Sequence, residues 1–412
     1  MRRVVVTGMG MVSPVGNDVE TCWDNALRAK SGIDKITLYD ASEYRVNIAA
    51  EVKGFDSSKY VDKKEERRLT RFLKFAIGAS YEAIESSGID LESVDLNRFG
   101  TSVGVGLGSL ESFTDASYVF RDKGERRISP FFLPYAIPNM ASGVVSLKHG
   151  LKGPNVCVAT ACSSGSHGIG EAYLYIKNGM ADMMLAGGAE SAITPVGIGA
   201  FASMKALSTY NDEPQSASRP FDKDRNGFVM GEGSGVLVLE DYDHAIKRGA
   251  NILAEVVGYG VTGDAYHITS PAPRGEGGAR VMKAAIDMAN IDPSQVDYIN
   301  AHGTSTKLND QYESEAIMDV FGDSAHKLSV SSTKGVTGHC VGAAGGIEAV
   351  FTVKALMHQI VPPTANLQEA DEGLTLDYTP KEPKERQLEY ALSNSFGFGG
   401  TNACLAFKAY KN

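Results

Sequence analysis

The stretch that decides the fold runs Asn155-Val156-Cys157-Val158-Ala159-Thr160-Ala161-Cys162-Ser163-Ser164-Gly165-Ser166-His167-Gly168-Ile169-Gly170. Its β-branched, apolar beginning predicts a buried strand. Small residues then break the strand, and Glu171-Ala172-Tyr173-Leu174-Tyr175-Ile176-Lys177 predicts a helix. A cysteine at such a turn lies beside the free N–H groups of the helix, which favour a thiolate. Cys162 is therefore a candidate nucleophile, and a buried structural cysteine is the alternative.

Length and composition are those of an ordinary globular chain. Its 412 residues, 43% hydrophobic and 22% charged, leave room for two domains or one large one. A net charge of −10 argues against non-specific binding of nucleic acid. Five scattered cysteines without a CxxC pair indicate a reducing compartment and offer neither a disulfide framework nor a zinc site. Without a signal peptide or a membrane-spanning run, we expect a cytoplasmic protein with no membrane partner.

Strands alternate with helices along both halves of the chain, which predicts an α/β fold. We expect strands at 3–7, 100–107, 183–188, 236–240 and 253–260, and a helix over 18–29. Residues 327–339 resemble the deciding stretch as a strand and glycine turn, and 345–354 continue as a helix, with His339 near the turn instead of a cysteine. We therefore expect two halves related by duplication, 1–250 and 251–412, whose turns meet at one site.

Two short patterns leave alternatives open. Gly8-Met9-Gly10 is similar to the start of a dinucleotide-binding loop, but Ser13 takes the third glycine position, so we favour a turn that ends the strand. Residues 59–74 carry basic side chains three and four apart, which predicts a basic helix face. That face could dock an acidic partner or could simply be solvated. A second basic pair, Arg126-Arg127, is expected in a loop.

Three further stretches place reactive residues in small-residue turns. His302 follows a predicted strand, Lys334 and His339 lie in the second glycine turn, and 393–402 is a glycine loop able to present backbone N–H groups. A single histidine is more often structural than catalytic. A cysteine and two histidines in such turns point together to one catalytic site.

Four motifs, taken together, resemble the β-ketoacyl-[acyl-carrier-protein] synthases, the elongating condensing enzymes of fatty-acid synthesis. The motifs are Thr160-Ala161-Cys162-Ser163-Ser164, Asn300-Ala301-His302-Gly303-Thr304-Ser305-Thr306, Ser332-Thr333-Lys334 with Thr337-Gly338-His339, and Asn394-Ser395-Phe396-Gly397-Phe398-Gly399-Gly400-Thr401-Asn402. The resemblance spans essentially the whole chain and is closest to the type II synthases. It implies a thiolase-like fold, with two duplicated mixed-sheet halves in a five-layered αβαβα arrangement.

The resemblance also implies roles for individual residues. Cys162 would be the acyl-accepting nucleophile, and His302 and His339 the paired histidines of condensation. Lys334 would shape the electrostatics of the site, and Phe396 would gate it and share the oxyanion hole with Cys162. The implied substrate-binding residues are Leu107 and Phe201 in the acyl pocket, Thr304 and Thr306 on the pantetheine arm, and Thr269, Phe398 and Gly399. The implied docking surface for acidic carrier protein comprises Lys64, Arg67, Arg68, Arg126, Arg127 and Lys205.

The chemistry explains these residue types. A thiolate accepts an acyl chain from carrier protein, and two backbone N–H groups stabilise the oxyanion. Malonyl-carrier protein then loses carbon dioxide, two neutral imidazoles stabilise the enolate, and the carbanion attacks the acyl thioester. A lysine nearby keeps the imidazoles neutral. The product is 3-oxoacyl-carrier protein two carbons longer. The scheme needs no metal or other cofactor, and the family implies a homodimer.

Two residues depart from the family pattern, and four other classes of protein are alternatives to a type II synthase. Lys307 and Cys340 differ from the usual family pattern, which leaves pocket shape and acyl-length preference open. The rivals are a type I synthase, a polyketide ketosynthase, a degradative thiolase and a non-catalytic chain-length factor. A bulky Leu107 favours type II over type I, and Cys162 argues against a chain-length factor. A thiolase would use a second cysteine where this chain has histidines.

Overall fold

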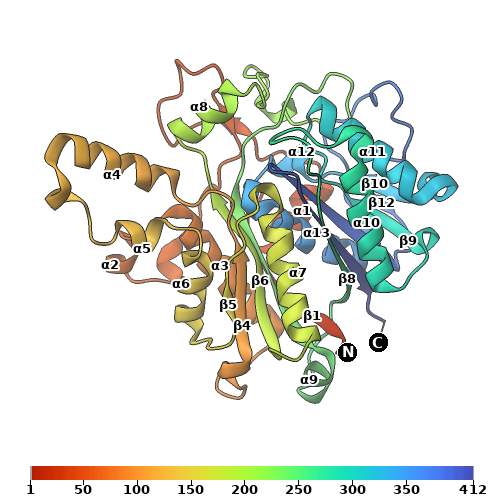
Figure 1. Ribbon diagram of the computed structural model, residues 1–412, viewed down its shortest axis with the longest axis horizontal. Coiled ribbons are helices and arrows are strands. Elements are labelled where there is room, and N and C mark those ends of the chain that lie inside the picture. The colour runs from red at the N-terminus through yellow and green to blue at the C-terminus, as the bar shows by residue number, and fades with distance from the viewer. Residues whose placement is uncertain (1, 412) are drawn as a thin grey trace.

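The computed structural model describes residues 2–411, an α/β fold built on a ten-stranded mixed sheet (Figure 1). The order of strands is β10-β9-β13-β14-β8-β1-β7-β6-β4-β5. These strands are β1 (Val4–Val12), β4 (Phe99–Gly104), β5 (Asn155–Val156), β6 (Met183–Ser191), β7 (Glu232–Asp241), β8 (Ala254–Gly263), β9 (Val296–Asn300), β10 (Ser329–Ser331), β13 (Tyr390–Gly397) and β14 (Thr401–Ala409). Two small ribbons pair β2 (Asp34–Lys35) with β3 (Ile48–Ala49) and β11 (Ile360–Val361) with β12 (Lys384–Glu385).

Helices cover both faces of this sheet. The α-helices are α1 (Val19–Leu27), α2 (Lys63–Glu66), α3 (Arg71–Ser87), α4 (Leu110–Lys123), α5 (Phe132–Ala136), α6 (Met140–His149), α7 (Ser164–Lys177), α8 (Pro195–Ser203), α9 (Tyr242–Lys247), α10 (Glu276–Ala289), α11 (Lys307–Phe321), α12 (Lys334–Thr337) and α13 (Ala344–His358). The 3₁₀ helices span Ser57–Lys59, Leu96–Arg98, Glu125–Arg127, Ala161–Ser163, Pro214–Ser216, Pro273–Gly275, Pro293–Gln295, Gly322–His326 and Val341–Ala343. Within residues 2–411, every helix is too short or too polar to cross a lipid bilayer.

The elements form the five αβαβα layers that the sequence predicts. Helices α7 and α13 lie in the middle and contact strands from both halves of the sheet (Figure 1). Helix α3 covers β1, β6 and β7 on one outer face, whereas α10 covers β8 and β14 on the other. The central helices approach each other closely because they carry glycines: a Cβ on Gly165 would lie 2.7 Å from the backbone nitrogen of Gly346.

The two halves of the sheet have the same topology. When each half is followed outward from the β1–β8 pair, strands that correspond in chain order occupy the same places. From β1 the order is β7, β6, β4, β5, and from β8 it is β14, β13, β9, β10. The β1–β8 ladder is antiparallel and joins the halves into one sheet. The boundary near residue 250 stays a prediction, and the outermost residues of its two halves, Met1 and Asn412, lie outside the described residues.

Most predicted elements are confirmed with shifted bounds, but the predicted turn at Gly8 is wrong. Strand β1 continues to Val12, so Gly8 and Gly10 lie inside a strand. A Cβ at either position would collide with a backbone carbonyl of α3, that of Ala83 or Ala79. The two glycines therefore let α3 pack directly on the strand, and they form no nucleotide loop.

The strand predicted before Cys162 is also largely wrong. Only Asn155 and Val156 pair in a ladder, with β4 alone, and residues 157–161 are half-buried or exposed. An edge strand with a single neighbour leaves its other side open, so an apolar run there need not be buried. The turn that carries Cys162 therefore follows a short edge strand rather than a long central one, and it leads directly into α7.

The basic stretch 59–74 does not form one helix. Helix α2 ends at Glu66, and α3 begins only at Arg71, with Thr70 before it. Arg71 turns inward and pairs with buried Glu232, so it is not part of any basic face. The pair Arg126-Arg127, predicted in a loop, lies in a short 3₁₀ helix.

Candidate active site

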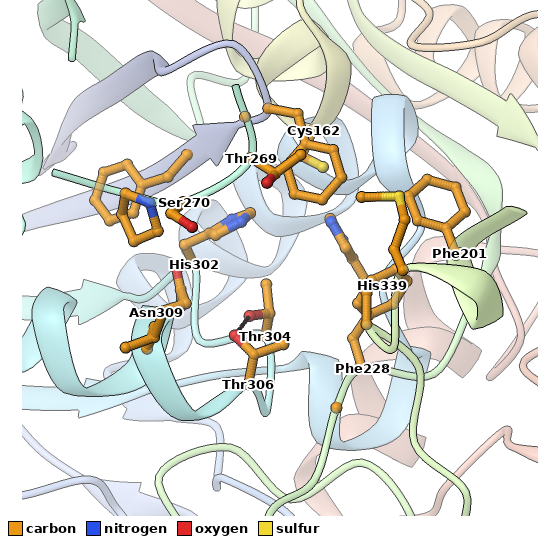
Figure 2. Close-up of a pocket in the computed structure, with 18 of the residues that line it drawn as sticks. Cys162, Phe201, Phe228, Thr269, Ser270, His302, Thr304, Thr306, Asn309 and His339 are labelled. Atoms are coloured by element: carbon orange, nitrogen blue, oxygen red, sulfur yellow. Dashed lines mark hydrogen bonds between the residues drawn. The ribbon is translucent and has the colours of Figure 1, made fainter. Parts of the chain in front are cut away.

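Cys162, His302 and His339 face one cavity of about 400 Å³ (Figure 2). They come from segments far apart in the sequence. Cys162 lies in the 3₁₀ turn before α7, His302 follows β9, and His339 follows α12. The predicted convergence of the turns at one site is therefore confirmed in space.

The thiol of Cys162 lies at the buried end of the cavity, with 8% of the residue exposed. The preceding residue, Ala161, has a φ of 50°, which makes the turn into the helix sharp. Burial raises the pKa of the Cys162 thiol to about 12, although the positive charge of Lys334 lowers it. Burial thus opposes the thiolate that a helix N-terminus favours, because desolvation of the thiol outweighs the effect of Lys334 on its pKa.

The two histidines form a pair. Their ring centroids are 5.4 Å apart and their planes are nearly perpendicular, at 88°. Burial and then the charge of Lys334 lower the pKa of both rings well below the usual 6.5. Among the described residues, Nδ1 of neither ring has a hydrogen-bond partner. Since an unpaired buried N–H is rarer than an unpaired acceptor, the Nε2–H tautomer is favoured in both rings.

Lys334 lies behind the cavity rather than in its lining. Its ammonium group pairs with the carboxylate of Glu348 on α13, and both side chains are almost fully buried. Burial raises the pKa of Glu348 to about 7, against the opposing effect of Lys334. The charge of Lys334 thus lowers the pKa of Cys162 and of both histidines. Nothing in the sequence pointed to Glu348 as its partner.

A second glutamate that sequence reasoning missed holds His302 in place. The carboxylate of Glu313, on α11, accepts the backbone N–H groups of His302 and Gly303, each at 2.8 Å. The side-chain amide of Asn394 donates to the same carboxylate at 3.1 Å. Burial raises the pKa of Glu313 to about 6. A glutamate on the buried face of the helix that follows the histidine motif was the available signal.

The glycine loop is the turn of the β13–β14 hairpin, and Ser163 ties it to the nucleophile turn. The Ser163 hydroxyl lies 3.1 Å from the carbonyl oxygen of Ser395 and 2.7 Å from that of Thr401. We predicted that Phe396 supplies the second oxyanion N–H. That role stays a prediction, and the backbone N–H of Phe398, two residues later, also lies beside the thiol, where it lowers the pKa of Cys162.

Comparison with known proteins identifies the family of this chain. Residues 1–245 match the family described as "Beta-ketoacyl synthase, N-terminal domain", and 253–368 match "Beta-ketoacyl synthase, C-terminal domain". The chain belongs to the beta-ketoacyl synthase family. It is a condensing acyltransferase, as the sequence predicts.

Relatives agree with this assignment over the full length of the synthase. It is 50% identical over 410 residues to a protein of Staphylococcus aureus (strain COL) named "3-oxoacyl-[acyl-carrier-protein] synthase 2", covering 100% of this chain and 99% of the relative. A protein of the same name from Vibrio harveyi is 50% identical over 408 residues, 99% of this chain and 98% of the relative. The crystal structure of a beta-ketoacyl synthase from Burkholderia phymatum STM815 is 36% identical with a TM-score of 0.93, covering 100% of both chains.

One solved structure carries a carrier protein. It is described as "AntDE:AntF (apo): type II PKS acyl-carrier protein in complex with its ketosynthase bound to the hexaketide", with 34% identity and a TM-score of 0.91, and each chain is covered completely.

The predicted substrate-binding residues of the synthase divide into two groups. Phe201, Thr269, Thr304, Thr306 and Phe398 line the cavity, together with Phe396. The hydroxyls of Thr304 and Thr306 are hydrogen-bonded to each other at 2.9 Å (Figure 2). Leu107 lies outside the lining but packs in the apolar cluster that contains Cys162 and Phe201. Gly399 also lies outside it, and its N–H donates to the carbonyl oxygen of Ile268 at 2.8 Å.

The cavity of the synthase has further walls that the sequence did not indicate. The Phe228 ring lies 5.2 Å from that of His339 and 5.5 Å from that of Phe201. Asp264, Ser270, Asn309 and Asn402 also line it. Asp264 and Ser270 lie in a loop without a motif of its own, Asn309 lies in α11, and Asn402 ends the glycine motif at the start of β14. Within residues 2–411, no three His, Cys, Asp or Glu side chains come together as metal ligands would.

The two residues that depart from the family pattern differ in position. Lys307 lines the cavity, and its ammonium group donates to the carbonyl oxygen of Lys223 and lies 3.4 Å from the Asp371 carboxylate. Cys340 is buried away from the cavity, and its Sγ lies 3.5 Å from the carbonyl oxygen of Glu232. The first departure therefore changes the surface of the substrate path, and the second is a packing residue.

The predicted docking residues lie at the surface of the synthase. Lys64, Arg67, Arg126, Arg127 and Lys205 are exposed, and Arg68 is half-buried. The guanidinium group of Arg68 stacks on the ring of Phe131 at 3.9 Å, which brings the end of α2 close to the segment after Arg126-Arg127. Lys205 lines the cavity itself.

Proposed function

We propose that this synthase elongates fatty acids by joining malonyl-acyl-carrier protein to an acyl chain held on Cys162, giving 3-oxoacyl-carrier protein two carbons longer. One observation carries the proposal: a thiol and two neutral imidazoles meet at one cavity, beside a backbone N–H of a glycine hairpin. No metal or redox group enters any step.

In the first step, the sulfur of Cys162 attacks the acyl thioester, and the carrier's pantetheine thiol leaves. Because burial keeps Cys162 protonated, its proton must be removed as the new bond forms. A neutral imidazole in the same cavity can take the proton and return it to the leaving thiolate. The N–H groups of Cys162 and Phe398 stabilise the tetrahedral oxyanion, each by about 3 kcal/mol.

In the second step, malonyl-carrier protein enters and its carbon–carbon bond to the carboxylate breaks. Carbon dioxide leaves, and the electron pair passes onto the thioester as an enolate. Nε2–H groups of His302 and His339 donate to the enolate oxygen, which neutral rings can do without losing a proton. The carbanion then attacks the Cys162 thioester, and the thiolate of Cys162 leaves and takes up a proton from water.

The acidic partner is the carrier protein, in its acyl and malonyl forms. Lys64, Arg67, Arg68, Arg126, Arg127 and Lys205 form the proposed docking surface, on a chain that is acidic overall. The carrier-bound ketosynthase structure supports this partner. The 50% identity to proteins named synthase 2, against 34% to the polyketide ketosynthase, favours fatty-acid elongation over the polyketide alternative. Five free cysteines support a cytoplasmic location, where thiols stay reduced.

The proposed assembly is a homodimer. Helix α4 projects from the body (Figure 1), and none of its residues is buried. Phe113, Tyr118 and Phe120 of this helix and Leu133 of α5 are between 40% and 58% exposed. Strand β5 also leaves one edge of the sheet unpaired within the described residues. An apolar arm beside an open sheet edge suits a second copy of this chain, and sedimentation of the wild type against Phe120→Glu tests it.

The histidines separate the two steps and so test the proposed reaction. We expect His302→Ala and His339→Ala each to become acylated on Cys162, because the remaining imidazole can still take the thiol proton. Each variant should lose condensation by at least about 100-fold, because the enolate loses one of its two N–H donors. The matched control is His326→Ala, an exposed histidine that should leave both steps unchanged. Condensation by either variant at the wild-type rate would contradict the proposal. The assay follows acyl-enzyme by intact mass and 3-oxoacyl product in the same samples.

A further inference from the structure

Glu190 is a buried carboxylate that the reaction above does not use. It lies one residue before the end of β6 and is fully buried. Its Oε2 atom accepts backbone N–H groups from Gly106 at 2.9 Å, Leu107 at 3.0 Å and Gly342 at 3.3 Å. Its Oε1 atom has no partner among the described residues. A buried carboxylate with this set of donors joins segments that are otherwise separate in the chain.

The three donors belong to the two sides of the apolar region around Cys162. Gly106 and Leu107 follow β4, and Gly342 lies in the 3₁₀ turn that contains Val341. Leu107 and Val341 pack in the same apolar cluster as Cys162. One carboxylate oxygen therefore fixes the backbone of both walls at the place where an acyl chain on Cys162 would extend.

Two glycines make room for this contact. A Cβ at Gly106 or at Gly342 would lie 2.8 Å from Oε2 of Glu190. A Cβ at Gly106 would also lie 3.1 Å from the carbonyl oxygen of Ala161 and 3.1 Å from Cγ1 of Val341. The turn that carries Cys162, the Leu107 loop and the Val341 turn thus meet around Gly106, beside the Glu190 carboxylate.

We propose that Glu190 is a positioning residue of the acyl pocket, which holds the Leu107 and Val341 walls at a fixed separation and so sets the acyl lengths that Cys162 accepts. The inference rests on the proposed function. It assigns Glu190 no contact with the substrate. The acyl chain would touch the side chains of Leu107 and Val341, and Glu190 would act through their backbone.

Glu190→Gln tests the proposal, with Glu82→Gln as the matched control. The variant keeps the shape and one acceptor oxygen but loses the charge that strengthens the three N–H bonds. Glu82 accepts two backbone N–H groups in the same way, from Met11 at 2.8 Å and Val19 at 2.7 Å, outside the cavity. Both variants should be less stable than the wild type.

The readout is the chain-length profile of Cys162 acylation, measured by intact mass with a series of acyl-carrier proteins. We expect Glu190→Gln to change the ratio of long-chain to short-chain kcat/KM by about tenfold, and Glu82→Gln to leave the ratio unchanged. An unchanged ratio in Glu190→Gln would overturn the inference and leave the proposed function intact. A wild type that accepts no acyl chain would overturn both.

A measurement on the wild type guards against a Glu190→Gln variant that does not fold. Hydrogen exchange should show that the amides of Leu107 and Gly342, which share the Oε2 acceptor, open with the same free energy. Different opening free energies for the two amides would show that the walls move independently and would overturn the proposal.

Discussion

Two turns of the synthase have the same backbone and carry different side chains. The 3₁₀ helix Ala161–Ser163 leads into α7, and the 3₁₀ helix Val341–Ala343 leads into α13. Each begins with a residue other than glycine at positive φ, 50° for Ala161 and 46° for Val341. Aligned on these residues, Cys162 corresponds to Gly342.

The side chains explain why only the first turn presents a reactive group to the cavity. At the second position, Cys162 places its thiol in the cavity, whereas Gly342 has no space for a side chain because Glu190 and the backbone of Gly106 occupy it. At the third position, the hydroxyl of Ser163 binds the β13–β14 hairpin, and Ala343 has no such group. Two turns of similar backbone can thus carry the proposed nucleophile in one half of the chain and a packing centre in the other.

The largest effect should come from Lys334, whose buried ammonium group pairs with Glu348 on the helix that follows the second turn. Lys334→Met leaves Glu348 buried without its cation, which should lower the free energy of unfolding by about 3–5 kcal/mol. Glu348 has a folded pKa raised to about 7, so its ionisation destabilises the fold as pH rises through that value, and the loss should be smaller at pH 6 than at pH 8. Urea unfolding of wild type and Lys334→Met at both pH values measures the loss in the free energy of unfolding.

The control for this prediction removes both charges. Lys334→Met combined with Glu348→Leu should recover most of the lost stability, because no buried charge is left unpaired. Equal stability of the single and the double variant would contradict the role assigned to the ion pair.

The second prediction forces a side chain into the packing turn. Gly342→Ala places a Cβ against the backbone of Gly106 and the carboxylate of Glu190, and it should lower the free energy of unfolding by about 3 kcal/mol. Gly199→Ala is the control, since a Cβ at Gly199 meets nothing within 4 Å. If both substitutions shift the thermal midpoint equally, the difference between the turns does not arise from space.

The third prediction makes the nucleophile turn resemble its counterpart. Ser163→Ala removes the hydroxyl that Ala343 also lacks, and it should lower the free energy of unfolding by about 1 kcal/mol. It should also lower kcat, because the hairpin that presents the Phe398 N–H is no longer tied to the turn. Ser80→Ala, a buried serine outside the cavity, should lose similar stability at unchanged kcat. An unchanged kcat in Ser163→Ala would contradict the idea that Ser163 positions the hairpin N–H that stabilises the oxyanion.

The smallest effect concerns the protonation of the histidines. The pKa of both His302 and His339 lies well below 6.5, so NMR of labelled histidine should show both rings neutral from pH 8 to pH 6. A lowered pKa means that these groups add stability above pH 6.5, which is lost as pH falls. In Lys334→Met the pKa of both rings should rise, because one lowering charge is gone. Titration of either wild-type ring near 6.5 would contradict this.

The sequence predicts the site better than it predicts the strands around it. Cys162, His302 and His339 stand out because reactive side chains in small-residue turns have few structural explanations. The strand before Cys162 could not be predicted, since an apolar run at a sheet edge looks the same as one in the centre. The sequence likeness of the two turns also misled us about His339, which lies before Val341 and is not the counterpart of Cys162.

Residues that act through others were the hardest to predict. Glu190, Glu313 and Glu348 lie outside the four motifs, and only the fold brings each carboxylate to the groups that it holds. The oxyanion N–H was predicted at Phe396, whereas the N–H found beside the thiol is that of Phe398, because the direction of an N–H in a hairpin turn depends on backbone geometry that motifs do not specify.

The most direct test of the account is acyl transfer to Cys162. Wild type, Cys162→Ala and Cys157→Ala would each be incubated with acyl-carrier protein, analysed by intact mass and peptide mapping, and then given malonyl-carrier protein. The account predicts one acyl group on Cys162 and 3-oxoacyl product for wild type and Cys157→Ala, and neither for Cys162→Ala. Acylation that persists in Cys162→Ala, or a wild type that accepts no acyl chain of any length, would contradict it.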